Sequence, residues 1–301
     1  MSALPSVSIV VPAYNAVRYI GEAVTSLLMQ DHPDFEIIVV DDGSMDGTAD
    51  IAGAFGDRVI LHRQVNAGQS AALRVGWSMA RGELIGYLSA DDRLRPEATR
   101  RCAEVLAARP ECVLVYPDFD LIDESSHRTG TVRAPEFSRW ALYANLHCMP
   151  GPGSLFRRSA YEAAGPWNPQ FRQIPDLDFF LRVALHGDFI RLPEVLADFR
   201  RHDESTTYRY APFDRGEEPL RMVSVFLGRQ DLSEDILRWE SAMRSNAHLL
   251  SAAIHGQSGR TALALKRILK AAMLSPSSMV SKKTLSYLKT ITKAARTTSV
   301  P

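Results

Sequence analysis

The chain has 301 residues, of which 46% are hydrophobic and 8% aromatic, so it can bury one large core or two modest ones. No stretch approaches the roughly 18 consecutive apolar residues that a membrane-spanning helix needs. The net charge of zero hides an asymmetry: residues 251–301 hold nine Lys or Arg and no Asp or Glu, whereas the other 250 residues hold 26 basic and 35 acidic side chains.

The amino terminus and the cysteines favour a cytoplasmic protein. The first residues, Met-Ser-Ala-Leu-Pro-Ser, contain no basic region followed by an apolar stretch, so we expect no secretory signal. The three cysteines, Cys102, Cys112 and Cys148, are odd in number and lack the spacing of a metal site. We therefore expect buried thiols of a reduced, cytosolic protein.

The first 116 residues alternate between continuous apolar runs and amphipathic stretches. Continuous Val, Ile and Leu runs are typical of strands that are buried on both faces. Strands and helices that alternate with short loops predict a parallel sheet with helices on both faces. The predicted strands are Val7–Val11, Ile37–Val40, Val59–His62, Leu84–Leu88 and Cys112–Tyr116, and the predicted helices include Thr48–Phe55 and Pro96–Arg109.

Polar groups follow the ends of these predicted strands. In an open α/β sheet, ligands bind just outside the carboxyl ends of the strands. No G-x-G-x-x-G follows the first strand, which disfavours a dehydrogenase, and no G-x-x-x-x-G-K-[ST] phosphate loop occurs. We expect Asn15 to cap the helix that follows it. The strand exits are Pro12-Ala13-Tyr14-Asn15, Asp41-Asp42-Gly43-Ser44, Asn66-Ala67-Gly68 and Ala90-Asp91-Asp92.

The pair Asp91 and Asp92, at the end of Leu84–Leu88, is a candidate cation site. Two carboxylates there can hold a hard divalent cation, and such cations usually also take oxygens from a substrate phosphate. The alternative is that Asp91 caps the next helix, for which Pro96 is a good first residue, and that Asp92 is solvated. The two residues by themselves leave both interpretations open.

The regular alternation ends after residue 116. Pro175-Asp176-Leu177-Asp178 precedes an amphipathic helix, and Val195–Phe199 is predicted as a strand that leads to Arg200-Arg201-His202. The rest of the chain is mostly helical in pattern, with predicted helices at Leu263–Leu274 and Met279–Ala295.

Seven segments taken together resemble a family 2 glycosyltransferase. No single segment is specific, but their order and spacing over about residues 5–205 are similar to those of the family. The segments are Ser8–Asn15, Val39–Thr48, Asn66–Ala72, Arg81–Glu83 ahead of Asp91-Asp92, Gly153–Arg157, Pro175–Phe180 and Phe199–His202.

The resemblance implies a GT-A fold, which is a Rossmann-like α/β architecture with a mostly parallel sheet flanked by helices, here with a helical C-terminal extension. Residues 1–116 would form its nucleotide-sugar-binding half, residues 117–212 its acceptor and catalytic half, and residues 213–301 a basic helical extension. The implied function is inverting, metal-dependent transfer of a sugar from a nucleotide-diphosphate sugar, with UDP-sugar the expected donor. The acceptor would be a hydroxyl group in cell-surface polysaccharide or glycolipid biosynthesis.

By the same resemblance, Asp42 accepts hydrogen bonds from the base and ribose of the donor. An ionised carboxylate only accepts, so it suits the N–H and hydroxyl edge that uracil and ribose offer. The alternative is an ordinary turn Asp before Gly43. Pro12, Ala13 and Tyr14 would lend backbone groups and a ring edge to the base, and Asn66 and Gly68 would line the nucleoside side of the pocket.

The implied cofactor is Mn²⁺ or Mg²⁺. Asp92 corresponds to the metal ligand of the family, and Asp91 to the residue that contacts ribose or a metal-bound water. His202 corresponds to a histidine near the metal or the diphosphate, and a neutral imidazole is a common metal ligand. The alternative for His202 is a surface histidine in the polar stretch that continues to Glu204.

Asp176 is the implied general base, which takes the proton of the acceptor hydroxyl as its oxygen attacks the anomeric carbon. A well-placed base contributes roughly 10²–10⁴ in rate. Asp178, two residues further along a helix, would point away from Asp176 and is interpreted as structural.

Two other functions remain possible at this point. A sugar-phosphate nucleotidyltransferase shares the architecture but needs a glycine-rich, basic loop after the first strand, where this chain has Pro-Ala-Tyr-Asn. A catalytically inactive scaffold that binds a nucleotide sugar is disfavoured by the presence of Asp42, Asp91, Asp92 and Asp176.

The basic tail, residues 251–301, suggests a further partner. It would either dock on the acidic remainder of the chain or hold the protein on the inner face of the cytoplasmic membrane, beside a lipid-linked saccharide acceptor. We expect no nucleic-acid partner.

Overall fold

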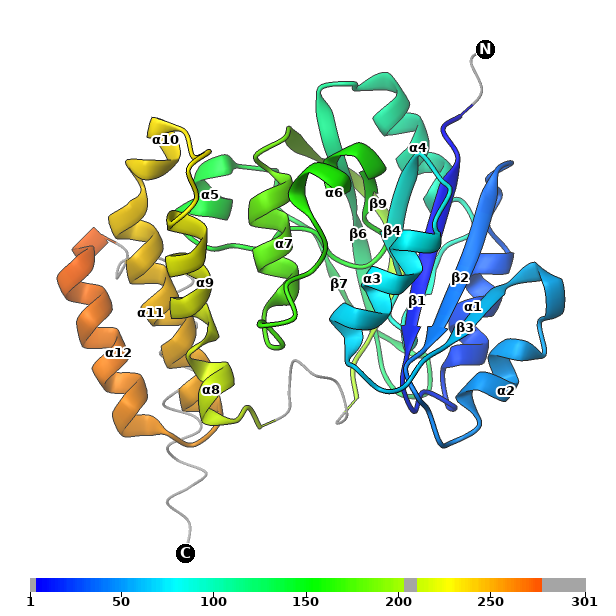
Figure 1. The fold of residues 1–301 in the computed structure, drawn as a ribbon, viewed down its shortest axis with the longest axis horizontal. Helices are drawn as coiled ribbons and strands as arrows, with labels where there is room; N and C mark the ends of the chain where they lie inside the picture. The colour runs from blue at the N-terminus through cyan, green and yellow to red at the C-terminus, as the bar shows by residue number, and fades with distance from the viewer. Residues whose placement is uncertain (1–3, 203–209, 278–301) are drawn as a thin grey trace, which may run out of the picture. The chain divides into compact units, whose positions relative to one another are not determined.

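The computed structural model describes residues 4–202 and 210–277, which divide into two compact units (Figure 1). The first unit contains the described residues of Met1–Phe137, Met149–Pro169 and Arg182–His202, and the second contains those of Ser138–Cys148, Gln170–Leu181 and Asp203–Pro301. Among the helices of these described residues, none has the length and apolar character needed to cross a membrane.

The first unit is built on a nine-stranded sheet with the order β3-β2-β1-β4-β8-β6-β9-β5, and β7 pairs with β6 beside this path. Its amino-terminal half matches the predicted alternation of strands and helices, and the four strands there pair in parallel. The elements are β1 (Val7–Ala13), α1 (Ile20–Leu28), β2 (Phe35–Asp41), α2 (Thr48–Gly53), a 3₁₀ turn (Gly56–Arg58), β3 (Ile60–Arg63), α3 (Gln69–Met79), β4 (Leu84–Tyr87) and α4 (Ala98–Ala108).

Both faces of this half are buried because successive side chains of a strand point to opposite faces. Ile9 and Val11 of β1 belong to the core that α1 and α4 cover, whereas Val10 faces α3. At Gly76 of α3, a Cβ would lie 2.3 Å from the Val10 side chain, so only glycine permits this close approach of helix and strand. The mostly parallel α/β architecture predicted from the sequence is confirmed.

The carboxyl-terminal half of the sheet departs from the prediction. The strand predicted at Cys112–Tyr116 is β6 (Cys112–Ile122), and the strand predicted at Val195–Phe199 is β9 (Asp188–Arg200), which pairs in parallel with β6. Between β4 and β6 lies an antiparallel strand, β8 (Leu155–Arg157), followed by α6 (Arg158–Ala164). Two short strands complete this half: β5 (Arg93–Leu94) and β7 (Arg128–Val132).

The two long strands were underestimated because charged residues interrupt their apolar pattern. Asp118 of β6 accepts hydrogen bonds from the Arg191 guanidinium of β9 at 2.7 and 2.9 Å, and Asp120 pairs with Arg128 of β7. Such cross-strand pairs neutralise the charges, so the strand continues through residues that look like its end.

The second unit is helical in the part of it that the structure describes. Tyr143 stacks on the rings of Phe226 and Trp239 at its core, and buried Glu218 accepts hydrogen bonds from the backbone N–H groups of Arg172 and Gln173. The helices are α5 (Arg139–Tyr143), most of α7 (Pro175–Val183), α8 (Phe213–Gly216), α9 (Glu218–Leu227), α10 (Glu234–Leu237), α11 (Glu240–Gln257) and α12 (Thr261–Leu274).

Two sequence predictions about the tail and the thiols have different outcomes. The helix predicted at Leu263–Leu274 is confirmed as α12, whereas the one predicted at Met279–Ala295 lies outside the described residues. Cys102 and Cys112 are buried free thiols as expected, but Cys148 is only half-buried.

Candidate active site

The exits of β1 and β2 are tied together by hydrogen bonds. The backbone N–H of Asn15 donates to Ser44 Oγ at 2.9 Å, and the backbone N–H of Met45 donates to Asn15 Oδ1 at 3.0 Å. Asn15 has a φ of 47°, a left-handed conformation that Asn tolerates better than most residues. The prediction that Asn15 caps a helix is wrong, because its side chain is engaged by Met45 and α1 begins only at Ile20.

Asp42 follows β2 and organises the loop after β3. Its Oδ1 accepts hydrogen bonds from Gln64 Nε2 at 2.7 Å and from the Ala67 N–H at 2.9 Å, and its Oδ2 accepts one from the Gly68 N–H at 2.8 Å. A carboxylate offers about four acceptor positions, so about one remains for a ligand. Asp42 is buried. A Cβ on neighbouring Gly43 would lie 2.8 Å from the backbone nitrogen of Asn66, which is closer than real Cβ atoms come, so only glycine fits there.

The other predicted donor-binding residues differ in how accessible they are. Pro12 and Ala13 are buried within β1, and the Ala13 carbonyl accepts a hydrogen bond from the Asp42 N–H at 2.8 Å. Tyr14 is half exposed and Asn66 is exposed, so both side chains are open to a ligand. Gly68 has a φ of 89° at the start of α3, where glycine permits this turn.

The ends of β4 and β9 bring Asp91, Asp92 and His202 together. His202 Nε2 lies 2.8 Å from Asp91 Oδ2, and the Arg200 backbone N–H donates to Asp92 Oδ1 at 2.9 Å. Burial, together with the nearby charge of Asp91, raises the pKa of Asp92 well above its usual value.

The structure contradicts the alternatives given for these three residues, namely a helix cap at Asp91, a solvated Asp92 and a surface histidine at 202. Asp92 is 3% exposed and is therefore not solvated, and α4 begins at Ala98 after Glu97, so Asp91 does not cap it. The His202 side chain is 9% exposed, which a solvated surface histidine would not be. Their proximity joins two segments that are 108 or more residues apart in sequence.

The three side chains offer two carboxylates and one imidazole as donors. No set of three His, Cys, Asp or Glu side chains forms a ready-made metal site in the part of the chain that the structure describes. Mg²⁺-type sites commonly use one or two protein carboxylates and complete their coordination with substrate phosphates and water. These side chains therefore fit a divalent cation only where other ligands, such as phosphate oxygens and water, complete its coordination.

Arg200 is the residue that the sequence analysis missed, although it stands in one of the quoted segments. Its side chain is fully buried, and its Nε donates to the Asp91 carbonyl at 2.9 Å, next to the backbone bond to Asp92. Its Nη2 pairs with Glu22 of α1 at 2.7 Å, and its guanidinium lies 4.6 Å from the Tyr19 ring centroid. One side chain thus connects β9, α1 and the turn that carries both aspartates.

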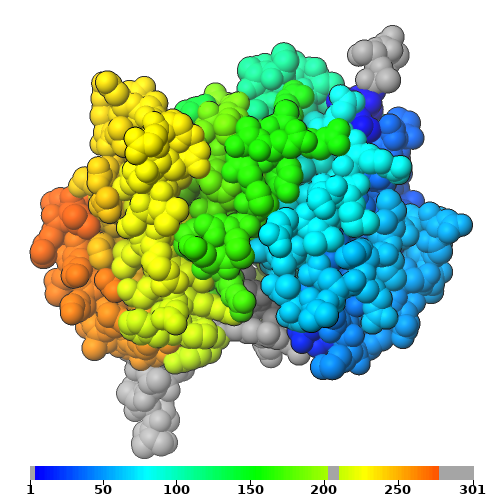
Figure 2. Space-filling model, viewed as in Figure 1, coloured from blue at the N-terminus to red at the C-terminus, as the bar shows by residue number. Residues whose placement is uncertain are grey.

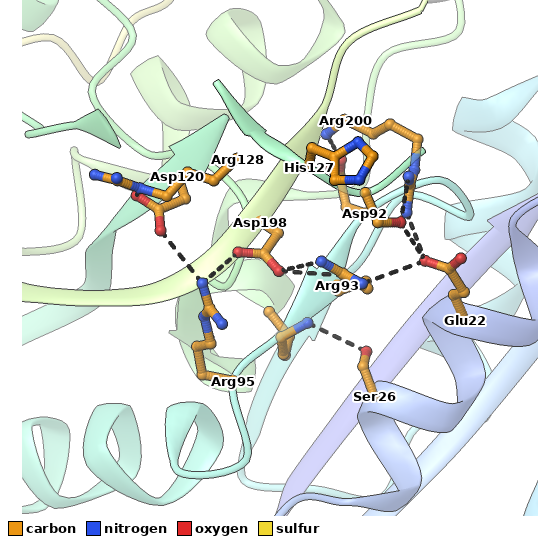
Figure 3. Close-up of polar contacts among 12 residues, drawn as sticks. Glu22, Ser26, Asp92, Arg93, Arg95, Asp120, His127, Arg128, Asp198 and Arg200 are labelled. Atoms are coloured by element: carbon orange, nitrogen blue, oxygen red, sulfur yellow. Dashed lines mark hydrogen bonds and ion pairs between the residues drawn. The ribbon is translucent and has the colours of Figure 1, made fainter. Parts of the chain in front are cut away.

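Figure 3 shows that this buried arginine belongs to a longer chain of ion pairs. Glu22 also pairs with Arg93 at 3.4 Å, and Arg93 pairs with Asp198 of β9 at 2.8 Å. Asp198 in turn pairs with Arg95 at 2.8 Å. Alternating charges along β5, β9 and α1 hold the turn that follows β4 in one geometry, and partial burial strengthens each pair relative to an exposed one.

Asp176 belongs to the second unit, in the first turn of α7. Its Oδ2 lies 3.8 Å from the Sγ of half-buried Cys148. Burial raises the pKa of Asp176, while hydrogen bonds from backbone N–H groups at the helix start and from Cys148 act in the opposite direction. Asp178 is buried, as expected for a structural residue.

Known proteins are similar to this chain in sequence and in fold. The model of a family described as glycosyl transferase family 2 matches residues 8–165. An uncharacterized glycosyltransferase of Rickettsia typhi is 31% identical over 240 residues, which cover 77% of this chain and 75% of that protein.

Two solved structures share the fold. S. aureus TarS residues 1–349, in complex with UDP-GlcNAc, superposes with a TM-score of 0.68 at 18% identity, covering 97% of this chain and 92% of that one. A mannosyltransferase from Pyrobaculum calidifontis, in complex with GDP-Man and Mn²⁺, superposes with a TM-score of 0.62 at 18% identity, covering 99% and 88%.

Proposed function

The chain belongs to glycosyl transferase family 2, and we propose that it is an inverting, metal-dependent enzyme that uses a nucleotide-diphosphate sugar. The observation that carries the proposal is the convergence of Asp91, Asp92 and His202 at the ends of β4 and β9. That edge of the sheet is where α/β folds bind nucleotides.

The donor would lie along the exits of β1, β2 and β4. The free acceptor position of Asp42 suits an N–H of the base, while Tyr14 and Asn66 present open side chains beside it. We propose a UDP-sugar, a choice supported by the UDP-GlcNAc bound to the similar S. aureus structure. The GDP-Man of the Pyrobaculum structure makes GDP-sugars the natural comparison in any test.

The proposed cofactor is Mn²⁺ or Mg²⁺, held by Asp92 and His202 with Asp91 beside them. A bound cation would neutralise charge on the leaving nucleoside diphosphate. The two carboxylates and the imidazole suit this role because they leave coordination positions for phosphate oxygens.

Asp176 is the proposed general base. As the acceptor oxygen forms its bond to the anomeric carbon, the bond from that carbon to the diphosphate breaks and the hydroxyl proton passes to the Asp176 carboxylate. One displacement from the opposite face inverts the configuration. A raised carboxyl pKa supports the role, because a base is more effective when its pKa is closer to the working pH.

The proposed acceptor is a saccharide or a lipid-linked saccharide of cell-surface polysaccharide or glycolipid assembly. The basic residues of 251–301 support a position on the inner face of the cytoplasmic membrane, where lipid-linked acceptors are found at anionic headgroups. No described residue argues for the nucleotidyltransferase alternative, since the β1 exit is neither basic nor glycine-rich.

The test is a thermal-shift screen of UDP, GDP and other nucleoside diphosphates, each with and without Mn²⁺. A ligand at about 100 times its dissociation constant stabilises the protein by roughly 2.7 kcal/mol, which is readily measured. We expect UDP with Mn²⁺ to give the largest shift. Release of the nucleoside diphosphate from the matching sugar donor then distinguishes an enzyme from an inactive scaffold, and binding without turnover would overturn the proposal.

A further inference from the structure

The inward face of α12 is complete within the second unit. Ala264 and Ala271 are fully buried, and Ala264 packs with Ala252 of α11. Arg267 also turns inward, where its guanidinium pairs with Glu217. The apolar groups of this face are therefore covered, and the charge of Arg267 is paired within the second unit.

The outward face of α12 is unusually apolar for a surface helix. Leu265, Leu269 and Met273 are 53%, 67% and 80% exposed, and their spacing of four residues places them in one row along the helix. A helix on the surface of a soluble domain normally presents polar residues there. Figure 2 shows the orange atoms of α12 open to view at the edge of the second unit.

Two lysines flank this row. Lys266 and Lys270 are exposed and, within residues 4–202 and 210–277, form no hydrogen bond or ion pair. The arginine between them, Arg267, is neutralised by Glu217, so the unpaired charges are confined to the outward side.

The type of basic residue changes from arginine to lysine along the sequence at α12. All six lysines of the sequence lie between residues 266 and 293, whereas 28 of the 29 arginines precede residue 268. Arginine is suited to forked pairs with carboxylates, as the pairs of Arg101 with Glu194 and of Arg191 with Asp118 illustrate. Lysine is a hydrated point charge on a flexible apolar stem, so its stem can lie along apolar side chains while its head reaches a charged surface.

We propose that the outward face of α12 binds an anionic lipid surface, with Leu265, Leu269 and Met273 entering the boundary between headgroups and acyl chains. Lys266 and Lys270 then reach the lipid phosphates beside this row. A helix that is apolar along one line and cationic beside it matches the composition of helices that lie in the membrane interface. This inference rests on the proposed function, because lipid binding by α12 would bring the enzyme to a lipid-linked acceptor.

Charge argues against the chain's own remaining segment as the occupant. Residues 278–301 carry five Lys or Arg and no Asp or Glu, so packing them on α12 would place like charges opposite Lys266 and Lys270. An acidic protein is less suitable because the row contains no aromatic or arginine anchor of the kind that dominates protein interfaces. A lipid surface satisfies both the cations and the flexible apolar side chains.

The test is sedimentation of the full chain with vesicles of phosphatidylglycerol and phosphatidylcholine, compared with phosphatidylcholine alone, at low and high salt. We expect binding to the anionic vesicles at low salt, with loss at high salt because the headgroup attraction is screened. The variant Lys266→Gln/Lys270→Gln should bind about thirtyfold more weakly, since each cation at an anionic surface contributes about fivefold. Leu269→Gln/Met273→Gln should also bind more weakly.

Matched controls test whether vesicle binding depends on this face of α12 or on any exposed cation or apolar side chain. Arg58→Gln/Arg133→Gln removes two exposed cations of the first unit, and Val225→Gln removes an exposed apolar residue of α9; both should bind like the wild type. The shift in thermal stability produced by UDP and Mn²⁺ should be the same in every variant. If UDP and Mn²⁺ produce no shift in the wild type, that result counts against the proposed function and does not bear on lipid binding.

Four results would overturn the inference. One is that the wild type stays in the supernatant with anionic vesicles at low salt. Another is that the α12 variants bind vesicles as tightly as the wild type. The third is that the protein binds neutral vesicles as tightly as anionic ones. Binding to an acidic polypeptide such as polyglutamate in place of vesicles would also overturn it, because that result would assign the face to a protein partner.

Discussion

The sheet edge of the first unit and the outward face of α12 use charge in opposite ways. Around Asp92, the charged side chains have fixed partners: Arg200 meets Glu22, and Arg93 meets Asp198 (Figure 3). On α12, Lys266 and Lys270 have no partner in the described part of the chain. Paired, buried charges fix a geometry, whereas unpaired, exposed charges remain available to another molecule.

The comparison also explains why the two regions should respond differently to mutation. A buried pair resists the loss of one member because the other is left as an uncompensated charge. An exposed residue without a partner contributes little to stability, so its loss is felt only in binding. The five predictions below test this difference, from the largest expected effect to the smallest.

Replacing the proposed metal ligand should abolish sugar transfer. In Asp92→Ala the cation loses a carboxylate, so turnover and the effect of Mn²⁺ on nucleotide binding should both disappear. The Arg200 N–H loses its acceptor, which should cost about 1–3 kcal/mol and leave the protein folded. Turnover and the thermal shift with UDP and Mn²⁺ measure these effects.

Asp57→Ala is the control, since Asp57 is an exposed carboxylate of the same unit. Near wild-type turnover of Asp92→Ala in the absence of metal would show that the cation site is assigned to the wrong residue.

Removing the proposed base should separate binding from chemistry. Asp176→Asn keeps the shape of the side chain but cannot take a proton, so turnover should fall by at least about a hundredfold while donor affinity persists. Steady-state kinetics and donor titration measure the two quantities. Equal losses in both would instead indicate a structural role for Asp176.

The same variant has a stability signature that depends on pH. Because burial raises the pKa of Asp176, the folded protein holds this proton more tightly than the unfolded chain does. The resulting stabilisation is present below the unfolded-state pKa, about 4, and is lost as pH rises through the higher folded-state value. The Tm of Asp176→Asn relative to wild type should therefore rise between pH 4 and pH 7, and a constant difference would contradict the assignment.

Replacing the buried arginine should weaken metal binding without touching a ligand. Arg200→Lys keeps a charge but loses the forked contacts to the Asp91 carbonyl and Glu22. Residues that orient metal ligands typically change affinity by about 10–100-fold, so Mn²⁺ affinity in the presence of UDP should fall within that range. Calorimetric titration well below the Tm measures it, with exposed Arg133→Lys as the control. Unchanged Mn²⁺ affinity would mean that Arg200 supports only the fold.

Changing the exposed row of α12 should leave stability almost unchanged. Leu269→Gln/Met273→Gln should alter the free energy of unfolding by less than about 0.5 kcal/mol, because both side chains are exposed. On the inward face, Ala271→Leu should cost about 1–3 kcal/mol through overpacking. Urea denaturation compares the two, and a large loss in the first variant would show that another part of the chain covers the row.

Much of the first unit could be predicted from the sequence because its signals are local. Continuous apolar runs such as Ile37–Val40 favour strands that are covered on both faces, and polar residues at their ends then meet at one edge of a parallel sheet. The positions of Asp42 and of the Asp91-Asp92 pair follow from this rule.

Other features depended on contacts between distant segments, which no local pattern contains. The antiparallel strand β8 and the full lengths of β6 and β9 depend on cross-strand pairs such as Asp118 with Arg191. The parallel register of β6 and β9 brings Arg200 and His202 back to Asp91 and Asp92. In the sequence, nothing distinguishes Arg200 from its neighbour Arg201. Only the tertiary structure buries the Arg200 side chain, among carbonyl and carboxylate oxygens that accept its hydrogen bonds. Burial of a charged group is costly unless such acceptors surround it.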